Sequence, residues 1–261
     1  WDDADASKRV LDLCINTAES EKSKKDAIIF KLRGIKHKYN LMKMLLKYNL
    51  TGFMMKHSKA KDINFLKLQK LKGNYDGKRC FIIGNGPSLK PEDLDKLTGE
   101  FTFGTNMVYK IFDQTKWRPS FHCVSDSIYA NQLGEELYEN VKSPLFTIEK
   151  TFNKMEKRPD DTVYVRSFPS DRYKVRGNVY SYVMVKATVL SLAMEMAFHL
   201  GFKEVYLLGV DCTNPHTKNG HFIKDYSSKE VANADINRIK KRLKTEQLST
   251  EEAGAHILDR S

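Results

Sequence analysis

From Arg79 onward, apolar residues group into short runs and longer periodic segments. Short apolar runs that end in turn residues are typical of strands buried on both faces, and apolar residues three or four positions apart indicate helices. The expected strands are Cys80–Gly84, Phe101–Thr105, Phe121–Ser125, Leu145–Ile148, Val163–Val165, Val205–Gly209 and His256–Leu258, and the expected helices are Pro91–Leu97, Ile128–Glu139, Val183–Leu200 and Lys229–Leu243. This alternation predicts an α/β fold with a mainly parallel sheet and helices on both faces.

Residues 150–182 interrupt the alternation with prolines, charges and four tyrosines, so we expect a lid-like excursion there. Before residue 78 the chain is basic and has apolar residues at helical spacing between residues 21 and 72. We therefore expect an N-terminal basic helical region over residues 1–77 and one catalytic domain over residues 78–261.

Charge is concentrated near the N-terminus. Residues 21–72 hold 15 Lys or Arg against three acidic residues, a balance of +12 in a chain of net charge +11. Apolar residues at helical spacing lie between these lysines, which predicts basic amphipathic helices. Two compatible interpretations are a subdomain packed on the core and a peripheral contact with an anionic membrane. Nucleic acid is not expected, because no nucleic-acid module or stacking platform is visible.

Cysteine usage and hydropathy indicate the compartment. No run approaches the roughly 18 apolar residues of a membrane-spanning helix. Cys14, Cys80, Cys123 and Cys212 form no C-x-x-C pair and are expected to be reduced thiols. We expect a cytoplasmic protein that can lie at the inner face of the cytoplasmic membrane.

The most informative motif is Gly84-Asn85-Gly86-Pro87-Ser88, directly after the first expected strand. Its glycines permit a sharp turn and a close ligand, and Pro87-Ser88 can open a helix with free N–H groups. Such a junction forms an anion site, most often for phosphate. It has neither the lysine of a P-loop nor a third glycine at position 89. A tight turn without a ligand is the alternative, although Asn85 and Ser88 add polar groups that it does not need.

Three more expected strands end in polar residues, at Thr105-Asn106, Ser125-Asp126 and Gly209-Val210-Asp211. Each alone could be a helix cap or a turn. Ligands of open parallel sheets bind beyond the carboxyl ends of the strands, so four such ends together indicate a polar ligand. Asn side chains both donate and accept, which suits phosphate, ribose and base edges.

The segment Ile82–Leu89, followed by Asn106, resembles the bacterial sialyltransferases of glycosyltransferase family 42. Leu200–Asp211 resembles their second motif and is equally similar to hydroxymethylpterin pyrophosphokinase-like proteins, which include the central domain of Maf flagellin glycosyltransferases. The resemblance covers Lys78 to about Asp259. It implies a Rossmann-like fold of the GT-A-variant type found in sialyltransferases.

The resemblance also implies an inverting glycosyltransferase without a metal or other cofactor. Its donor would be a CMP-linked sialic acid or related acidic sugar, and its acceptor a bacterial surface glycan or glycolipid. Thr213 stands where the family has a tyrosine and Asp126 where it tends to have asparagine, so Tyr180, Tyr182 or Tyr226 could replace a phosphate contact. The implied donor-binding residues are Asn85, Gly86, Pro87, Ser88, Asn106, Asp126, Thr188, Asp211 and Thr213.

Inverting transfer needs a base for the acceptor hydroxyl, and a neutral imidazole suits that role near pH 7. The family uses a histidine in the loop before its last long helix. That loop holds His221, the predicted catalytic base, with His216 as the second choice. His122, inside a strand, and His199, on an apolar helix, are expected to be structural.

Two other functions stay open. A Mg²⁺-dependent pyrophosphokinase would transfer diphosphate from ATP to a pterin alcohol, with Asp126 and Asp211 on the metal. Against it, the sequence has no strand-end Asp-x-Asp and no lysine in the glycine-rich turn. A non-catalytic nucleotide-binding scaffold is the third possibility. The sugar, the acceptor, the linkage and the oligomeric state are left open by the sequence.

Overall fold

The computed structural model describes residues 31–32, 34–54, 56–57, 62–149, 151, 161–168, 175, 179–184, 188–211 and 221–222. The chain divides into two compact units, residues 1–51 and 52–261, and each is described by itself. The first unit contributes most of a helix whose described residues are 31–32 and 34–54, here called the N-terminal helix. Across the described ranges, no helix is both long and apolar enough to cross a membrane.

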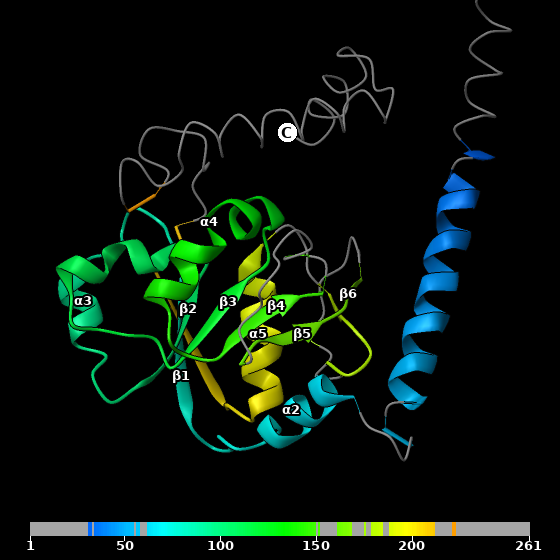
Figure 1. Ribbon diagram of the computed structural model, residues 1–261, viewed down its shortest axis with the longest axis horizontal. Helices are drawn as coiled ribbons and strands as arrows, with labels where there is room; N and C mark the ends of the chain where they lie inside the picture. The colour runs from blue at the N-terminus through cyan, green and yellow to red at the C-terminus, as the bar shows by residue number, and fades with distance from the viewer. Residues whose placement is uncertain are drawn as a thin grey trace, which may run out of the picture. The chain divides into compact units, whose positions relative to one another are not determined.

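A six-stranded sheet forms the centre of the second unit (Figure 1). All its pairings are parallel. Its spatial order is β5-β4-β3-β2-β1-β8, so the chain moves outward from β1 to β5 and then returns to the other side of β1. The strands are β1 (Arg79–Ile83), β2 (Phe101–Thr105), β3 (Phe121–Val124), β4 (Leu145–Ile148), β5 (Val163–Val165) and β8 (Glu204–Leu208).

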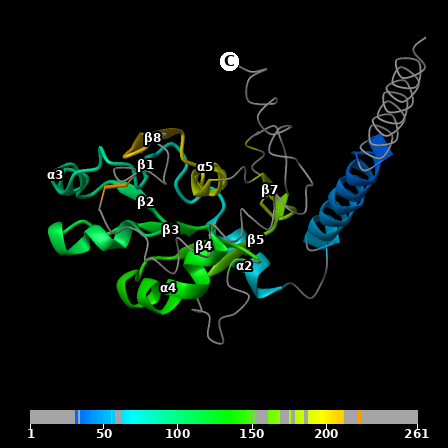
Figure 2. The ribbon, with the colours of Figure 1, turned by 90° about the horizontal axis from the view of Figure 1, so that it is seen from above.

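Helices cover both faces of the sheet, as Figure 2 shows from above. One face packs against α2 (Ile63–Leu71) and α5 (Val189–Leu200). The other packs against α3 (Pro91–Asp95), the 3₁₀ helix η1 (Val108–Gln114) and α4 (Ser127–Asn140). The layers confirm the predicted Rossmann-like α/β fold.

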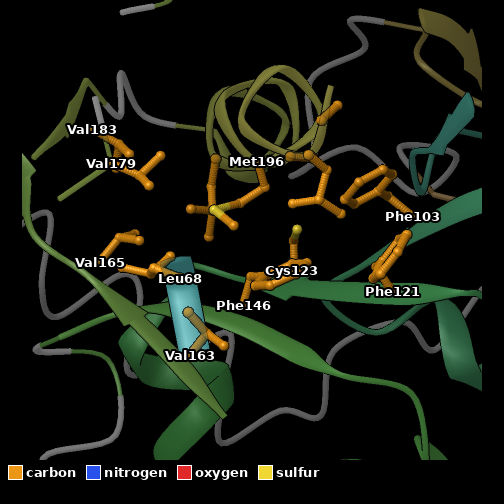
Figure 3. Close-up of a cluster of buried hydrophobic side chains, with 14 of the residues drawn as sticks. Leu68, Phe103, Phe121, Cys123, Phe146, Val163, Val165, Val179, Val183 and Met196 are labelled. Atoms are coloured by element: carbon orange, nitrogen blue, oxygen red, sulfur yellow. The ribbon is translucent and has the colours of Figure 1, made fainter. Parts of the chain in front are cut away.

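The alternation of side chains along the strands divides the core between these two faces. Ile82 packs on the α5 side and Ile83 on the other, and both are fully buried. On the α5 side, Met196 of the helix belongs to the same buried cluster as Phe103 and Phe146 of the sheet (Figure 3). Cys80 is a free, buried thiol, as predicted, and burial raises its pKa to about 12.

The helix that precedes β8 begins later than its apolar pattern predicts. Val183–Met184 forms β7, which pairs in parallel with β6 (Ser167–Phe168). Thr188 then takes an extended conformation, and its side chain accepts a hydrogen bond from the Leu190 N–H. The predicted start at Val183 is therefore wrong, because strand pairing and this cap determine the boundary.

The six strands of the sheet lie within one residue of their predicted positions. β8 is an edge strand of the described sheet, and Tyr206 and Leu207 are about half exposed. The predicted boundary at residue 77 lies after α2, whose Phe65 and Leu68 are buried in the core of the second unit. The predicted strand His256–Leu258 and helix Lys229–Leu243 lie outside the described residues.

Candidate functional site

The carboxyl ends of β1 and β8 meet at the point where the strand order reverses, which is where open α/β sheets bind ligands. The glycine-rich turn after β1 is bonded to the end of β8 through Gly84 N–H to Leu208 O and Gly86 N–H to Gly209 O, each at 2.8 Å. A Cβ added to Gly84 would overlap the Gly209 carbonyl oxygen, and one on Gly86 would overlap the Asp211 carboxylate. The two glycines thus permit the close approach of the two strand ends.

Ser88 and Asp211 join across this turn. The Ser88 N–H donates to Asp211 Oδ2 at 3.0 Å. A carboxylate therefore occupies the position where the sequence predicts a phosphate. α3 begins only at Pro91, so Pro87-Ser88 does not open a helix. Because Ser88 and Asp211 are both exposed, this bond is the one in the turn that a ligand can readily exchange.

The orientation of the Asn85 side chain is fixed by Thr105 at the end of β2. Asn85 Nδ2 donates to the Thr105 carbonyl at 3.0 Å and to Thr105 Oγ1 at 3.1 Å. The Thr105 hydroxyl in turn donates to Ile83 O at 2.6 Å. Both amide hydrogens of Asn85 are therefore used, and Oδ1 is left buried without a hydrogen-bond partner among the described residues. The available atom is an acceptor, which suits a hydroxyl or amine of a ligand and not a phosphate oxygen.

Asn106 follows β2 in a left-handed backbone conformation with a φ of 45°. His122 on β3 holds it there, because His122 Nε2 lies 2.8 Å from the Asn106 carbonyl, which can only accept. Burial lowers the pKa of His122 to about 4, so the ring is neutral and structural, as predicted. Asn106 Oδ1 is a second buried oxygen that lacks a partner in the described part of the chain.

His221 lies against the glycine-rich turn although it is 136 positions away in the chain. Its Nδ1 is 3.2 Å from the Asn85 carbonyl, and the Phe222 N–H donates to the same oxygen at 3.1 Å. Because a carbonyl only accepts, Nδ1 must donate, and in the neutral ring this leaves the lone pair on Nε2. This tautomer is the one that a base acting through Nε2 requires.

The other predicted site residues lie in the turn itself, next to α4 and α5, or outside the described residues. Asp126 is half-buried after β3, and its carbonyl accepts from the Ala130 N–H at 3.0 Å, which starts α4. Thr188 caps α5. Pro87 is exposed in the turn, whereas Thr213 and His216 lie outside the described residues.

The tyrosines considered for a phosphate contact belong to the core where they are described. Tyr180 packs its ring against Phe65 and His199 and is 7% exposed, and Tyr182 is 2% exposed. Tyr226 is outside the description. His199 is structural as predicted, with Nε2 2.8 Å from the Leu68 carbonyl.

The structure adds Thr105 to the site, because its hydroxyl and carbonyl fix the Asn85 side chain. The sequence indicated only that Thr105 stands at a strand end.

A separate cavity of about 200 Å³ opens near the ends of β4 and β5, lined in part by Glu149, Arg166 and Tyr180. In the described ranges, no three His, Cys, Asp or Glu side chains are grouped so that they could hold a metal ion.

Comparison with known proteins gives two likenesses. The family model described as 6-hydroxymethylpterin diphosphokinase MptE-like matches residues 53–217. Among solved structures, the chain is similar to the Maf glycosyltransferase from Magnetospirillum magneticum AMB-1, with 17% identity and a TM-score of 0.36 over 58% of this chain. The chain spans only 28% of that protein's length. A search of curated proteins finds no match.

Proposed function

Since the chain belongs to the 6-hydroxymethylpterin diphosphokinase MptE-like family, we propose that it is a transferase that moves a group from a nucleotide to an acceptor hydroxyl. The observation that carries this proposal is His221 beside the glycine-rich turn, with its Nδ1 hydrogen directed to the Asn85 carbonyl. Such a histidine can take the proton of a hydroxyl through Nε2 while the donor lies at the turn. Both chemistries considered below need this base.

The donor that we propose is a CMP-linked acidic sugar. Asn85 Oδ1 and Asn106 Oδ1 are buried acceptors at adjacent strand ends, and a buried acceptor without a partner is costly. A nucleoside offers the matching donors through its ribose hydroxyls, and cytosine offers its exocyclic amine. In the reaction, the acceptor oxygen bonds to the sugar carbon, the bond from sugar to phosphate breaks, His221 takes the hydroxyl proton and CMP leaves.

The Asp211 carboxylate favours a second candidate, a Mg²⁺-dependent diphosphokinase. The Asp211 carboxylate accepts the Ser88 N–H, so a phosphate bound at this N–H would be repelled by the negative charge of the carboxylate. Mg²⁺ relieves such repulsion, and it typically binds nucleotide phosphates with one or two protein carboxylates. Asp211 can supply one such carboxylate, whereas Asp126 follows β3, which β2 and β1 separate from β8. The base would then accept the proton of an alcohol that receives diphosphate from ATP.

A thermal-shift panel of CMP, CDP, UDP, GDP and ATP, each with and without Mg²⁺, distinguishes the two candidates. Ligand that binds only the native state stabilises it, by about 2.7 kcal/mol at a hundredfold excess over Kd. CMP is expected to raise the melting temperature equally with and without Mg²⁺. If only ATP with Mg²⁺ stabilises the protein, the diphosphokinase replaces the glycosyltransferase. No shift with any nucleotide would contradict both.

Replacement of Gly86 by alanine is expected to abolish the nucleotide-dependent shift. The new Cβ would overlap the Asp211 carboxylate and lie 2.8 Å from the Gly209 carbonyl oxygen, which forces the ends of β1 and β8 apart. Gly34→Ala is the matched control, because a Cβ there meets nothing within 4 Å. Circular dichroism shows whether the fold is kept. A folded Gly86 variant with an unchanged shift would move the ligand away from this turn.

A further inference from the structure

The N-terminal helix carries an exposed apolar stripe within the first unit. Six large apolar side chains at spacings of three or four residues are each between 57% and 63% exposed. At about 100° per residue they fall in a sector of about 80°, so they form one continuous face. Its members are Leu32, Ile35, Tyr39, Met42, Leu46 and Leu50.

Lysines border this stripe on both sides. By the same helical geometry, Lys36, Lys43 and Lys47 fall along one edge, and Lys31 and Lys38 fall along the other. Lys43 Nζ lies 4.8 Å from the centre of the Tyr39 ring, so at least one of these chains folds over the stripe. Residues 31–51 contain six Lys or Arg and no acidic residue. Leu41, Met44, Leu45 and Tyr48 lie on the opposite side of the helix and are half-buried, whereas Phe53 and Met54 near its end are exposed.

We propose that this face binds an anionic lipid surface, with the helix lying in the plane of the membrane interface. The apolar stripe would enter the boundary between headgroups and acyl chains, and the bordering lysines would reach the anionic headgroups with their long side chains. The positive charge beside the stripe favours anionic lipid over a second copy of the helix. Two copies of the helix would bring lysines against lysines without an acidic partner, whereas anionic lipid supplies both the apolar phase and the opposite charge.

The test is sedimentation of the full chain with vesicles of phosphatidylcholine alone and with added phosphatidylglycerol. Binding to the anionic vesicles and its weakening as salt rises are expected, because surface attraction is screened within about 10 Å at 0.1 M salt. The triple variant Lys36→Glu, Lys43→Glu, Lys47→Glu should bind at least roughly tenfold more weakly. Lys116→Glu, Lys142→Glu, Lys203→Glu makes the same charge change in exposed side chains of the second unit and should keep binding.

The apolar stripe is tested separately with Leu32→Gln, Ile35→Gln, Leu46→Gln, which leaves the charge unchanged and should also lose binding. Equal loss in both lysine variants, or full binding by the glutamine variant, would reduce the effect to general charge attraction and overturn the proposal. Equal binding to neutral and anionic vesicles, or to neither, would overturn it as well. Sedimentation velocity tests the remaining alternative, that the face binds a second copy of the chain. If the unaltered protein is a dimer that does not bind vesicles, and the glutamine variant is a monomer, the face belongs to a dimer interface. The result does not depend on the transferase proposal.

Discussion

Replacement of His221 by alanine is expected to lower turnover by roughly 10²–10⁴-fold, the usual contribution of a general base. The reason is geometric: the Asn85 carbonyl fixes the Nδ1 proton, so the lone pair is on Nε2. Nucleotide affinity should change little, because the lost ring would act on the acceptor hydroxyl. The rate of the unaltered protein should rise with pH as this ring loses its extra proton, since only the neutral ring accepts a proton.

The matched control is His37→Ala, at an exposed position of the N-terminal helix, which should keep normal turnover. Nucleotide-induced thermal shifts on each variant separate loss of catalysis from loss of binding. Near-normal turnover in a folded His221 variant would remove this residue from the mechanism. A collapse of nucleotide affinity would instead place its ring on the donor side.

The sheet was predictable because its strands are short apolar runs that end in turn residues. Ile82 and Ile83 face opposite layers, so a strand of this kind is apolar at consecutive positions and its pattern is legible in one sequence. The start of α5 could not be predicted from the sequence. Val183 is apolar in phase with that helix, but its N–H donates to Arg166 O at 2.7 Å and pairs β7 with β6. Pairing between distant segments leaves no local signal.

The same distinction applies to the site. Gly84, Asn85 and Ser88 are adjacent in the chain, and their chemistry could be inferred from residue types alone. The occupation of the Ser88 N–H by Asp211 could not, because it depends on β8 returning to the side of β1. The acceptor role of Asn85 Oδ1 likewise follows from bonds to Thr105 on a neighbouring strand. The sequence therefore indicated which residues to consider, and the topology determined which of their atoms lack partners among the described residues.

Acid is expected to destabilise the protein through His122, whose pKa of about 4 in the folded state lies below the value of about 6.5 in an unfolded chain. Between these two values the unfolded chain binds a proton that the folded protein excludes. The free energy of unfolding therefore falls as pH falls from about 6.5 to about 4, by roughly 3 kcal/mol from this group. His199 adds a contribution of the same sign, because burial lowers its pKa too.

Urea unfolding at pH 7, 5 and 4 measures this effect when the unaltered protein is compared with His122→Gln. Glutamine can donate to the Asn106 carbonyl but does not titrate, so the variant should lose much less stability over the same interval. His37→Gln, at an exposed position, is the control and should keep the full acid dependence. If the free energy of unfolding depends equally on pH in the unaltered protein and in His122→Gln, His122 takes up a proton as easily in the folded protein as in the unfolded chain. In that event the neutral ring could not be the group that holds Asn106 in its left-handed conformation at the edge of the site.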